Sequence, residues 1–206
     1  MIAIIKYNAG NIKSVENAVT RLGYNCVVTD NIDEIKKSEK VIFPGVGEAG
    51  SAMKYLREKK LDVLIKTLQQ PVLGICLGQQ LMCNFSEEGN TECLGIFDTS
   101  VKLFPSKEIV PHMGWNDLKN MRGDLFKGIQ EKENVYFIHS FYSEICEKTV
   151  AICDYILPFS AALEKNNFYS TQFHPEKSAI VGEKILFNFL SLNSGTHVEN
   201  SNYINR

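Results

Sequence analysis

A cysteine between two glycines is the first residue whose setting predicts chemistry. Residues 72–80 read VLGICLGQQ, so Cys76 ends an apolar run and forms the pattern G-x-C-x-G with Gly74 and Gly78. This pattern is the thiol form of the nucleophile elbow, in which a sharp turn between a strand and a helix exposes the reactive atom. The start of a helix also favours the thiolate, which is the form that attacks. Taken alone, these five residues fit a buried structural cysteine equally well.

A histidine and a glutamate two residues apart supply the groups that such a nucleophile needs. In QFHPE, residues 172–176, Pro175 disfavours a helix at His174, and the sequence predicts an extended segment. The side chains of His174 and Glu176 then point the same way from Cα atoms about 6.5 Å apart. The carboxylate can therefore orient the imidazole, as in a catalytic triad. An incidental surface ion pair is the plain alternative for these residues on their own.

A glycine-rich loop, residues 43–47 (FPGVG), follows another apolar run. By strand order it should lie beside the elbow, at the carboxyl ends of the parallel strands, where open α/β sheets bind ligands. Backbone N–H groups of Val46 or Gly47, together with that of Leu77, are candidates for an oxyanion hole. Because glycines flank Val46, its peptide can rotate at low cost, and we expect the hole to form fully only after the loop adjusts.

The elements that must position these residues follow from the hydrophobic pattern. Short apolar runs at residues 3–7, 26–30, 41–45 and 72–76 predict parallel strands buried on both faces, separated by helices. This order predicts an α/β fold with an open, mostly parallel, flavodoxin-like sheet that carries helices on both faces. Runs at residues 94–104, 136–145, 149–158 and 167–173 lie closer together and predict antiparallel additions to the sheet in the C-terminal half. A final helix from about Ile180 to Leu192 is expected to carry Ile185, Phe189 and Leu192 inward.

Length and composition limit the class of protein. The 206 residues with 44% hydrophobic content predict one domain over residues 1–193, and residues 194–206 predict a polar tail. A net charge of -2 without a basic cluster disfavours nucleic acid and anionic membranes as partners. We expect a soluble, cytoplasmic protein, because no apolar segment approaches the roughly 20 residues that span a bilayer and no leader pattern is present.

Metal and cofactor chemistry is not expected. The six cysteines form no C-x-x-C pair, and the four histidines do not join them at metal-ligand spacing. Residues 45–50, GVGEAG, match the G-x-G-x-x-G fingerprint of dinucleotide-binding oxidoreductases. That fingerprint belongs to the first strand-to-helix turn and expects an acidic residue about 20 positions later. Here it follows the third predicted strand and the next strand ends at Cys76, so the oxidoreductase remains the less favoured alternative.

Together these motifs resemble the class I glutamine amidotransferase family, which shares G-x-C-x-G-x-Q, here residues 74–80, with a later H-P-E, here residues 174–176. Within that family the chain is similar to glutaminase subunits of imidazole glycerol phosphate synthases. The segments that carry this finer resemblance are AGN at 9–11 with SV at 14–15, PGVG at 44–47, PHMGWN at 111–116, YFIHS at 136–140 and FHPEKS at 173–178. They run in order over nearly the whole chain.

The resemblance implies that Cys76, His174 and Glu176 form a triad that hydrolyses glutamine to glutamate and ammonia without a cofactor. It also implies a heterodimer with a (β/α)8-barrel cyclase subunit, which receives the ammonia and makes imidazole glycerol phosphate and AICAR in histidine biosynthesis. The substrate-binding residues implied are Gln80, Ser140 and Phe141, and those implied to face the cyclase are Asn11, Trp115, Tyr136 and Lys177.

One segment departs from the family pattern. The family usually has D-Y-G-x-G-N, whereas this chain has Lys6 and Asn8 on either side of Tyr7. The change leaves the triad untouched but lies in a loop near the expected partner surface. Related subunits also serve sugar-amidating synthetases of surface polysaccharide pathways, and such a partner is the second possibility. A non-catalytic relative that keeps the cysteine elbow is disfavoured, because it would not need an oriented base.

Overall fold

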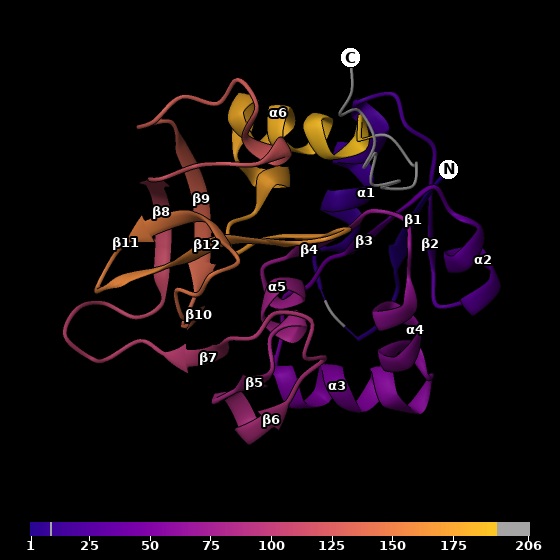
Figure 1. The fold of residues 1–206 in the computed structure, drawn as a ribbon, viewed down its shortest axis with the longest axis horizontal. Helices are drawn as coiled ribbons and strands as arrows, with labels where there is room; N and C mark the ends of the chain where they lie inside the picture. Colours follow the sequence, from indigo (N-terminus) through magenta and orange to yellow (C-terminus); the bar gives the residue numbers. More distant parts are fainter. Residues whose placement is uncertain (9, 193–206) are drawn as a thin grey trace, which may run out of the picture.

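The computed structural model describes residues 1–8 and 10–192, and within them a seven-stranded sheet crosses the molecule (Figure 1). Its strand order is β11-β12-β13-β4-β3-β1-β2. The parallel strands are β1 (Ile2–Ile5), β2 (Cys26–Thr29), β3 (Lys40–Phe43), β4 (Val72–Ile75) and β13 (Phe168–Thr171). Strands β11 (Thr149–Asp154) and β12 (Pro158–Lys165) join antiparallel at one edge. The predicted mostly parallel α/β sheet with antiparallel additions is therefore confirmed.

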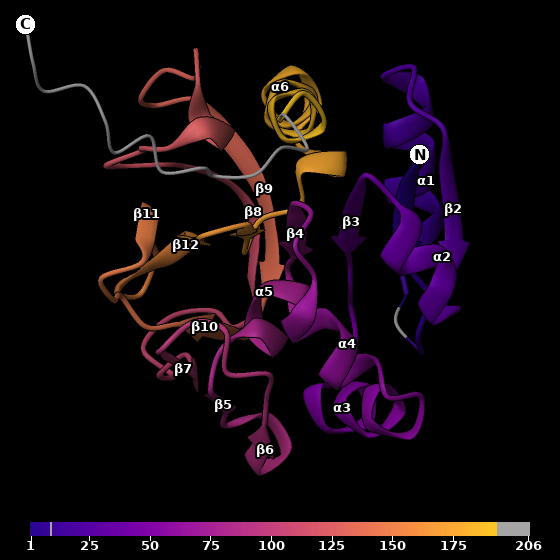
Figure 2. The ribbon, with the colours of Figure 1, turned by 45° about the vertical axis from the view of Figure 1, so that its right-hand side comes forward.

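Helices cover both faces of this sheet, as Figures 1 and 2 show. Helices α1 (Ile12–Arg21) and α6 (Ala179–Leu190) pack on one face. The other face carries α2 (Ile32–Lys37), α3 (Ala49–Glu58), α4 (Leu61–Thr67) and α5 (Leu77–Met82). All four residues of β1 are apolar because the strand is buried on both faces. Ile2 and Ile4 belong to the core on the face of α1 and α6, and Ala3 and Ile5 belong to the core on the other face.

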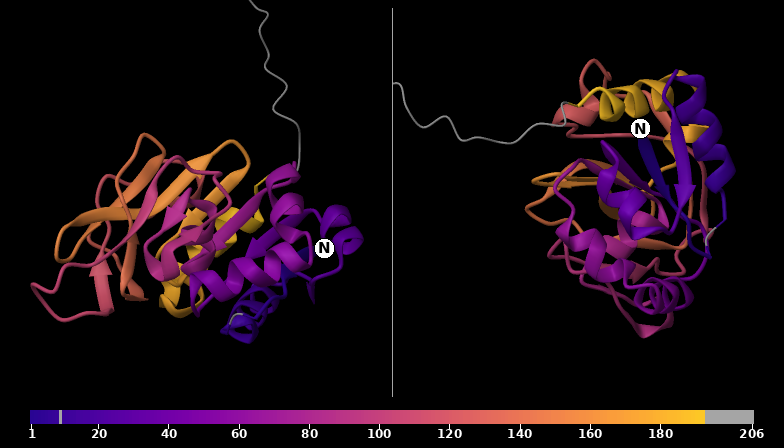
Figure 3. Two further views of the ribbon diagram at one scale, coloured as in Figure 1. Left: turned by 90° about the horizontal axis from the view of Figure 1, so that it is seen from below. Right: turned by 90° about the vertical axis from the view of Figure 1, so that its right-hand side faces the viewer.

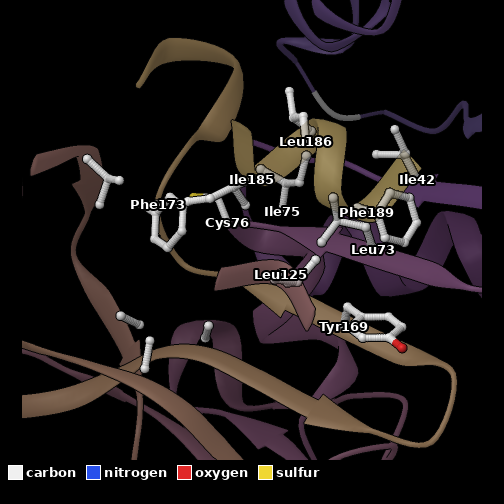
Figure 4. Close-up of a cluster of buried hydrophobic side chains, with 14 of the residues drawn as sticks. Ile42, Leu73, Ile75, Cys76, Leu125, Tyr169, Phe173, Ile185, Leu186 and Phe189 are labelled. Atoms are coloured by element: carbon white, nitrogen blue, oxygen red, sulfur yellow. The ribbon is translucent and has the colours of Figure 1, made fainter. Parts of the chain in front are cut away.

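The core under α6 ends at the elbow (Figure 4). Leu73 and Ile75 of β4 pack there with Ile185 and Phe189 of α6, and all four side chains are buried. The predicted burial of Ile185 and Phe189 is therefore confirmed, whereas Leu192 follows the end of α6 and is only partly buried against this core. Because apolar packing fixes β4 up to the residue before Cys76, the backbone that presents the thiol is held in place.

Two smaller sheets lie on the side of the molecule that carries β11 and β12, away from β2 (Figures 1 and 3). In the described part of the chain, one sheet has the order β10-β7-β5-β6, with β5 (Phe85–Ser86), β6 (Thr91–Glu92), β7 (Ser100–Leu103) and β10 (Phe141–Ser143). The other is the antiparallel pair of β8 (His112–Asp117) and β9 (Asn134–His139). Short 3₁₀ turns are η1 (Glu88–Asn90), η2 (Asp124–Phe126) and η3 (Pro175–Lys177).

Two parts of the strand prediction are wrong. The run at 167–173 gives β13, which pairs antiparallel with β12 but parallel with β4, so it is a parallel strand of the sheet centre. The runs at 94–104 and 136–145 form β7, β9 and β10, which lie outside the main sheet. Strands that are close in sequence often pair as hairpins, as β12 and β13 do. The strand that pairs on the other side of β13 is far away in the sequence, and the local pattern does not predict it.

Other expectations have mixed outcomes. Helix α6 ends at Leu190, two residues before the predicted end. None of the helices in the described residues has the length and apolar character needed to cross a membrane. The predicted polar tail, residues 194–206, lies outside the described residues, as does residue 9 of the AGN motif.

Candidate active site

Cys76 occupies a sharp turn between β4 and α5. Its backbone has φ 54° and ψ -107°, a conformation that residues with a side chain rarely adopt and that clusters at functional sites. The turn is held by the Cys76 N–H, which donates to the Thr171 carbonyl at 2.7 Å. A Cβ atom on Gly78 would lie 1.9 Å from the Phe43 carbonyl oxygen, so only glycine lets α5 approach β3 this closely. The strand, turn and helix predicted around the thiol are present.

His174 and Glu176 form a buried pair. The His174 Nδ1 donates to Glu176 Oε1 at 2.7 Å, and the two side chains are 1% and 0% exposed. The same Oε1 accepts a hydrogen bond from the Asn11 side-chain amide. Because Nδ1 is held by the carboxylate, Nε2 is the ring atom left to exchange a proton, and among the described residues it has no hydrogen-bond partner.

The route by which the carboxylate reaches the ring differs from the prediction. His174 itself is extended, with φ -99° and ψ 95°, but Pro175–Lys177 form a 3₁₀ turn rather than an extended segment. Proline is favoured in the first turn of a helix, because its missing N–H would be unpaired there anyway. The turn is closed by the Lys177 N–H and the Ser178 hydroxyl, which both donate to the His174 carbonyl.

The charge state of His174 suits proton transfer to a leaving group. Burial alone would lower its pKa, but the charge of the nearby Cys76, followed by the hydrogen bond and charge of Glu176, raises the pKa of His174 to about 10. The arrangement therefore favours a protonated imidazole next to a cysteine sulfur. A protonated imidazole can give its proton to a departing amine, and the neighbouring cysteine is the nucleophile type that such an oriented histidine serves.

A cavity of about 170 Å³ opens beside the thiol. Its lining includes Cys76 and the predicted residues Val46, Gly47, Leu77, Gln80, Ser140 and Phe141. Positions that lie far apart in the sequence therefore meet around the nucleophile. A small, half-open cavity with convergent polar groups is the usual form of a small-molecule site.

The cavity also contains residues that the sequence analysis missed, namely Glu88, Ile138 and His139. Glu88 is half-buried, and burial is the main cause that raises the pKa of its carboxyl group above the ordinary value. Its Oε2 accepts from the Ala49 N–H at 2.8 Å. Glu88 stands in the acidic turn SEEGN, which matches no catalytic pattern, so only the fold reveals its place.

One proposed oxyanion donor is engaged in another contact, and the loop that carries the other two is anchored through its carbonyl groups. The Leu77 N–H donates to the Gly45 carbonyl at 3.2 Å, and the Val46 carbonyl accepts from the Gly10 N–H at 3.1 Å. The Tyr7 hydroxyl, buried below the loop, donates to the Pro44 carbonyl at 2.5 Å. The loop must therefore shift before the Leu77 N–H can bind an oxyanion.

The same loop is unsuited to a pyrophosphate. The Glu48 carboxylate accepts from the N–H groups of Gly50 and Ser51, each at 2.7 Å, and Glu88 accepts from that of Ala49. These are the donors that a dinucleotide would need at the start of α3. Two carboxylates occupy them and would repel a phosphate, which argues against the oxidoreductase alternative.

The residues expected to face a partner lie near each other. Trp115 is 54% exposed and its ring makes an edge contact with Tyr136, with centroids 5.9 Å apart. The Lys177 ammonium lies 5.8 Å from the centre of the Tyr136 ring. Asn11 joins this group through its bond to Glu176. The exposed side chain of Met113, on the same strand as Trp115 and two residues before it, extends the surface and was missed by the sequence analysis.

The comparison with protein families decides the class. The model of the glutamine amidotransferase class-I family matches residues 3–192. The chain belongs to this family. A relative from Bacteroides fragilis, named imidazole glycerol phosphate synthase subunit HisH, is 61% identical to this amidotransferase over 93% of the chain and 99% of the relative. Relatives with the same name from Bacteroides thetaiotaomicron and Shewanella loihica are 57% and 44% identical, covering 93% and 96% of the chain and 99% and 93% of the relatives.

Solved structures confirm the fold of the amidotransferase. A crystal structure of a glutamine amidotransferase matches with a TM-score of 0.72 at 18% identity and covers 92% of this chain and 97% of that chain. The structure of PurLQS from Thermotoga maritima matches with a TM-score of 0.67 at 16% identity, covering 92% of this chain and 96% of that chain. At such low identity the likeness speaks for the architecture alone.

Proposed function

We propose that this amidotransferase is the glutaminase subunit of an imidazole glycerol phosphate synthase. It hydrolyses glutamine to glutamate and ammonia and passes the ammonia to a cyclase subunit in histidine biosynthesis. The observation that carries the proposal is the buried His174–Glu176 pair, whose ring pKa is raised by the neighbouring Cys76 thiol at the edge of the cavity. The relatives with 57–61% identity that carry the synthase name support the pathway.

Glutamine carries an ammonium group, a carboxylate and a side-chain amide, and the cavity offers polar groups for binding it. Its ammonium suits the half-buried carboxylate of Glu88, which provides a charge-assisted contact. The side-chain nitrogen of Gln80 donates to the Phe141 carbonyl at 2.9 Å and to Gln172 Oε1 at 3.0 Å, so its own carbonyl oxygen is left to accept from the substrate. Ser140 and Phe141 also line the cavity and can offer backbone groups to the substrate.

The first half of the reaction forms an acyl-enzyme. The thiolate of Cys76 attacks the side-chain amide carbon of glutamine, and the carbonyl oxygen becomes an oxyanion. Backbone N–H groups of Leu77 and of Val46 or Gly47 stabilise it once the loop has shifted. The carbon–nitrogen bond then breaks, His174 gives its proton to the departing nitrogen, and ammonia leaves behind a γ-glutamyl thioester on Cys76.

The second half regenerates the enzyme. Neutral His174 takes a proton from a water molecule, and the resulting hydroxide attacks the thioester carbon. The carbon–sulfur bond breaks, glutamate leaves, and the thiolate of Cys76 is restored beside the imidazolium. Glu176 keeps Nδ1 protonated throughout, so that Nε2 alone exchanges protons.

The partner is a (β/α)8-barrel cyclase, which docks on the surface of Asn11, Trp115, Tyr136 and Lys177 and makes imidazole glycerol phosphate and AICAR. The hydrogen bond from Gly10 to Val46 connects the loop next to Asn11 with the glycine-rich loop, so docking beside Asn11 can shift the oxyanion donors. Glutamine is then hydrolysed only when ammonia has an acceptor. The exposed Lys6 and Asn8 flank this connection and set the fit to the cyclase.

The experiment measures glutamate production by the chain alone, with the barrel cyclase, and with the cyclase plus its ribulosyl substrate, using Cys76→Ala as the control. Strong stimulation by the liganded cyclase that disappears in Cys76→Ala supports both the reaction and the pathway. Glutaminase activity that the cyclase does not change assigns the chain to another partner, such as a sugar-amidating synthetase of a surface polysaccharide pathway.

A further inference from the structure

A second glutamine, Gln172, lies against the nucleophile. It precedes Phe173 at the end of β13 and is fully buried, and its side-chain nitrogen is 3.6 Å from Cys76 Sγ. A buried amide that contacts a cysteine sulfur is a group that the reaction described above leaves unused. A donor that faces a sulfur atom favours the charged thiolate, because a hydrogen bond to the ionised form stabilises that form.

The neighbouring groups fix which end of this amide faces the sulfur. The Phe141 carbonyl can only accept, so the Gln80 side chain presents its nitrogen there, at 2.9 Å. The other N–H of that nitrogen donates to Gln172 at 3.0 Å, and the atom of Gln172 that receives it must be the oxygen. The Gln172 nitrogen is consequently the end that faces Cys76 Sγ.

The Phe141 carbonyl, which orients the Gln80 amide, also accepts a hydrogen bond from a buried histidine. His139 Nδ1 donates to the Phe141 carbonyl at 2.7 Å, and His139 Nε2 accepts from His112 Nδ1 at 3.1 Å. Burial lowers the pKa of His139 to about 3, so the ring stays neutral and keeps this donor and acceptor pattern. The orientation of the Gln172 amide thus rests on a buried chain of hydrogen bonds that reaches from β8 to the nucleophile.

The charged His174 ring is the strongest electrostatic neighbour of Cys76, and besides it the sulfur has two hydrogen-bonding neighbours with opposite preferences. The Ile138 carbonyl, 3.9 Å away, accepts a hydrogen bond from the thiol but repels the thiolate. The Gln172 N–H donates to sulfur, and such a bond strengthens when the acceptor becomes charged. The balance between these neighbours therefore contributes to the fraction of Cys76 that is ionised.

We propose that Gln172 is a catalytic residue that stabilises the thiolate of Cys76 through its side-chain N–H, and that Gln80 is the positioning residue that aims this N–H. The inference rests on the proposed glutaminase function, in which the same thiolate both attacks glutamine and departs from the thioester. Gln172 holds the sulfur in both steps, and no proton passes through the amide.

The test uses Gln172→Met, which keeps the length of the side chain and removes the donor, and Gln172→Glu, which places a carboxylate oxygen against the sulfur. The matched control is Gln79→Met, because Gln79 is equally buried but its amide bonds to Ser143, Ser160 and Ser170. Alkylation of Cys76 by iodoacetamide is followed from pH 5 to 10 in the full chain, by mass spectrometry of the Cys76 peptide. Thermal unfolding of each variant reports the structural cost.

The half-maximal pH of alkylation is expected to rise by about one unit in Gln172→Met, which lowers the rate near neutral pH by up to about tenfold. In Gln172→Glu the rise is larger, and in Gln79→Met the profile stays at that of the wild type despite lower stability. Profiles of both Gln172 variants that match the wild type overturn the proposal, as does an equal shift in Gln79→Met. If Gln172→Met does not fold, Gln172→Glu, which has the same shape as glutamine, decides alone.

The assay needs neither glutamine nor a partner, so it separates this inference from the proposed function. If no glutamate is produced even with the liganded cyclase while the alkylation profile still shifts in Gln172→Met, the proposed function is refuted and the thiolate contact stands. If the complex is an active glutaminase but the alkylation profiles of the Gln172 variants do not shift, the proposed function stands and the thiolate contact is refuted.

Discussion

The two sides of the active site differ in how ready they are for reaction. On one side, His174, Glu176 and Asn11 are already joined by hydrogen bonds around a protonated ring. On the other side, the glycine-rich loop uses its polar groups internally, with the Leu77 N–H bound to Gly45 and the Val46 carbonyl bound to Gly10. The pair that we propose for acid–base chemistry is thus assembled in the isolated chain, whereas the proposed oxyanion donor of Leu77 is bonded elsewhere.

The difference follows from what each side is built on. The elbow and the His174 turn end strands β4 and β13, which lie side by side at the centre of the sheet above a packed core. The glycine-rich loop is anchored by single hydrogen bonds and contains Gly47 at φ +139°, a conformation natural only to glycine. A rigid nucleophile beside an adjustable oxyanion loop lets a partner control the reaction without altering the nucleophile.

The largest expected effect is on the assembled side. Cys76→Ala and His174→Ala should each lower the glutaminase rate of the partner complex by a factor on the order of 10⁶, because the groups of a triad act as a unit. Steady-state glutamate production measures the loss, and the double variant is the control. Losses that multiply in the double variant would show that the two residues act independently, which contradicts the assembled pair.

A smaller effect is expected from Gly47→Ala on the adjustable side. Space is open there, since the nearest atom to an added Cβ is Leu77 Cδ2 at 4.0 Å, so the change acts through backbone freedom. Alanine keeps the N–H group but restricts the rotation that would aim it at the oxyanion. Glutaminase activity should therefore fall about a hundredfold, while alkylation of Cys76 is unchanged.

Gly23→Ala is the matched control for Gly47→Ala, because Gly23 has φ +86° with nothing within 4 Å and lies after α1. Both variants should lose about 1 kcal/mol of unfolding free energy through strain. An equal loss of glutaminase activity in both would remove the special role assigned to the loop.

Asn11→Ala tests the outer support of the acid–base side and should cost about tenfold in kcat. The variant removes the amide bond to Glu176 Oε1 and leaves the bond to His174, so the ring is held less firmly but keeps its tautomer. Asn11→Asp is the control, because its oxygen repels the carboxylate and should lower the rate further. Unchanged kcat in both variants, measured with the partner present, contradicts a positioning role for Asn11.

The smallest expected effect is on the pH dependence of stability. It concerns His112 and His139, which are neutral, in contrast to the protonated His174. Burial lowers the pKa of His112 to about 4 and that of His139 to about 3. Such groups stabilise the fold above the unfolded pKa near 6.5, and this contribution is lost as the pH falls toward 4 and 3. Each histidine should therefore cost up to about 1 kcal/mol of unfolding free energy per pH unit on acidification.

Urea unfolding of the wild type and of His112→Phe at pH 7 and pH 5 measures this contribution. The aromatic replacement keeps the stacking of His112 on Phe137 and Tyr155 and removes one titrating group. The loss of stability between the two pH values should shrink by about 1 to 2 kcal/mol in the variant. An identical loss in both proteins would mean that His112 does not titrate with folding.

The sequence was informative wherever function depends on short spacing. The pattern around Cys76 predicted the strand, turn and helix, and the two-residue step from His174 to Glu176 predicted the pair, although the turn between them is helical rather than extended. These features depend on neighbours in the chain, which local rules describe. The family resemblance added Gln80, Ser140 and Phe141, which also line the cavity.

What the sequence did not contain was the pairing of distant elements. Gln172 and Gln80 meet across 92 positions, and nothing in the residues TQF marks that contact. Glu88 enters the cavity only because η1 lies against α3, and the engagement of the Leu77 N–H depends on the exact path of a glycine-rich loop. Each of these is settled by tertiary packing, which overrides local preference.

The most direct test of partner control compares two reactions of one atom. Alkylation of Cys76 by iodoacetamide needs a thiolate but no oxyanion hole, whereas formation of the γ-glutamyl thioester from glutamine needs both. Both rates are measured on the same preparation, with and without the liganded cyclase, by mass spectrometry of the Cys76 peptide. We predict that alkylation is unchanged by the partner while acylation rises at least about a hundredfold. A partner that raises both rates in parallel would contradict this view, because the thiolate would then be what the partner completes.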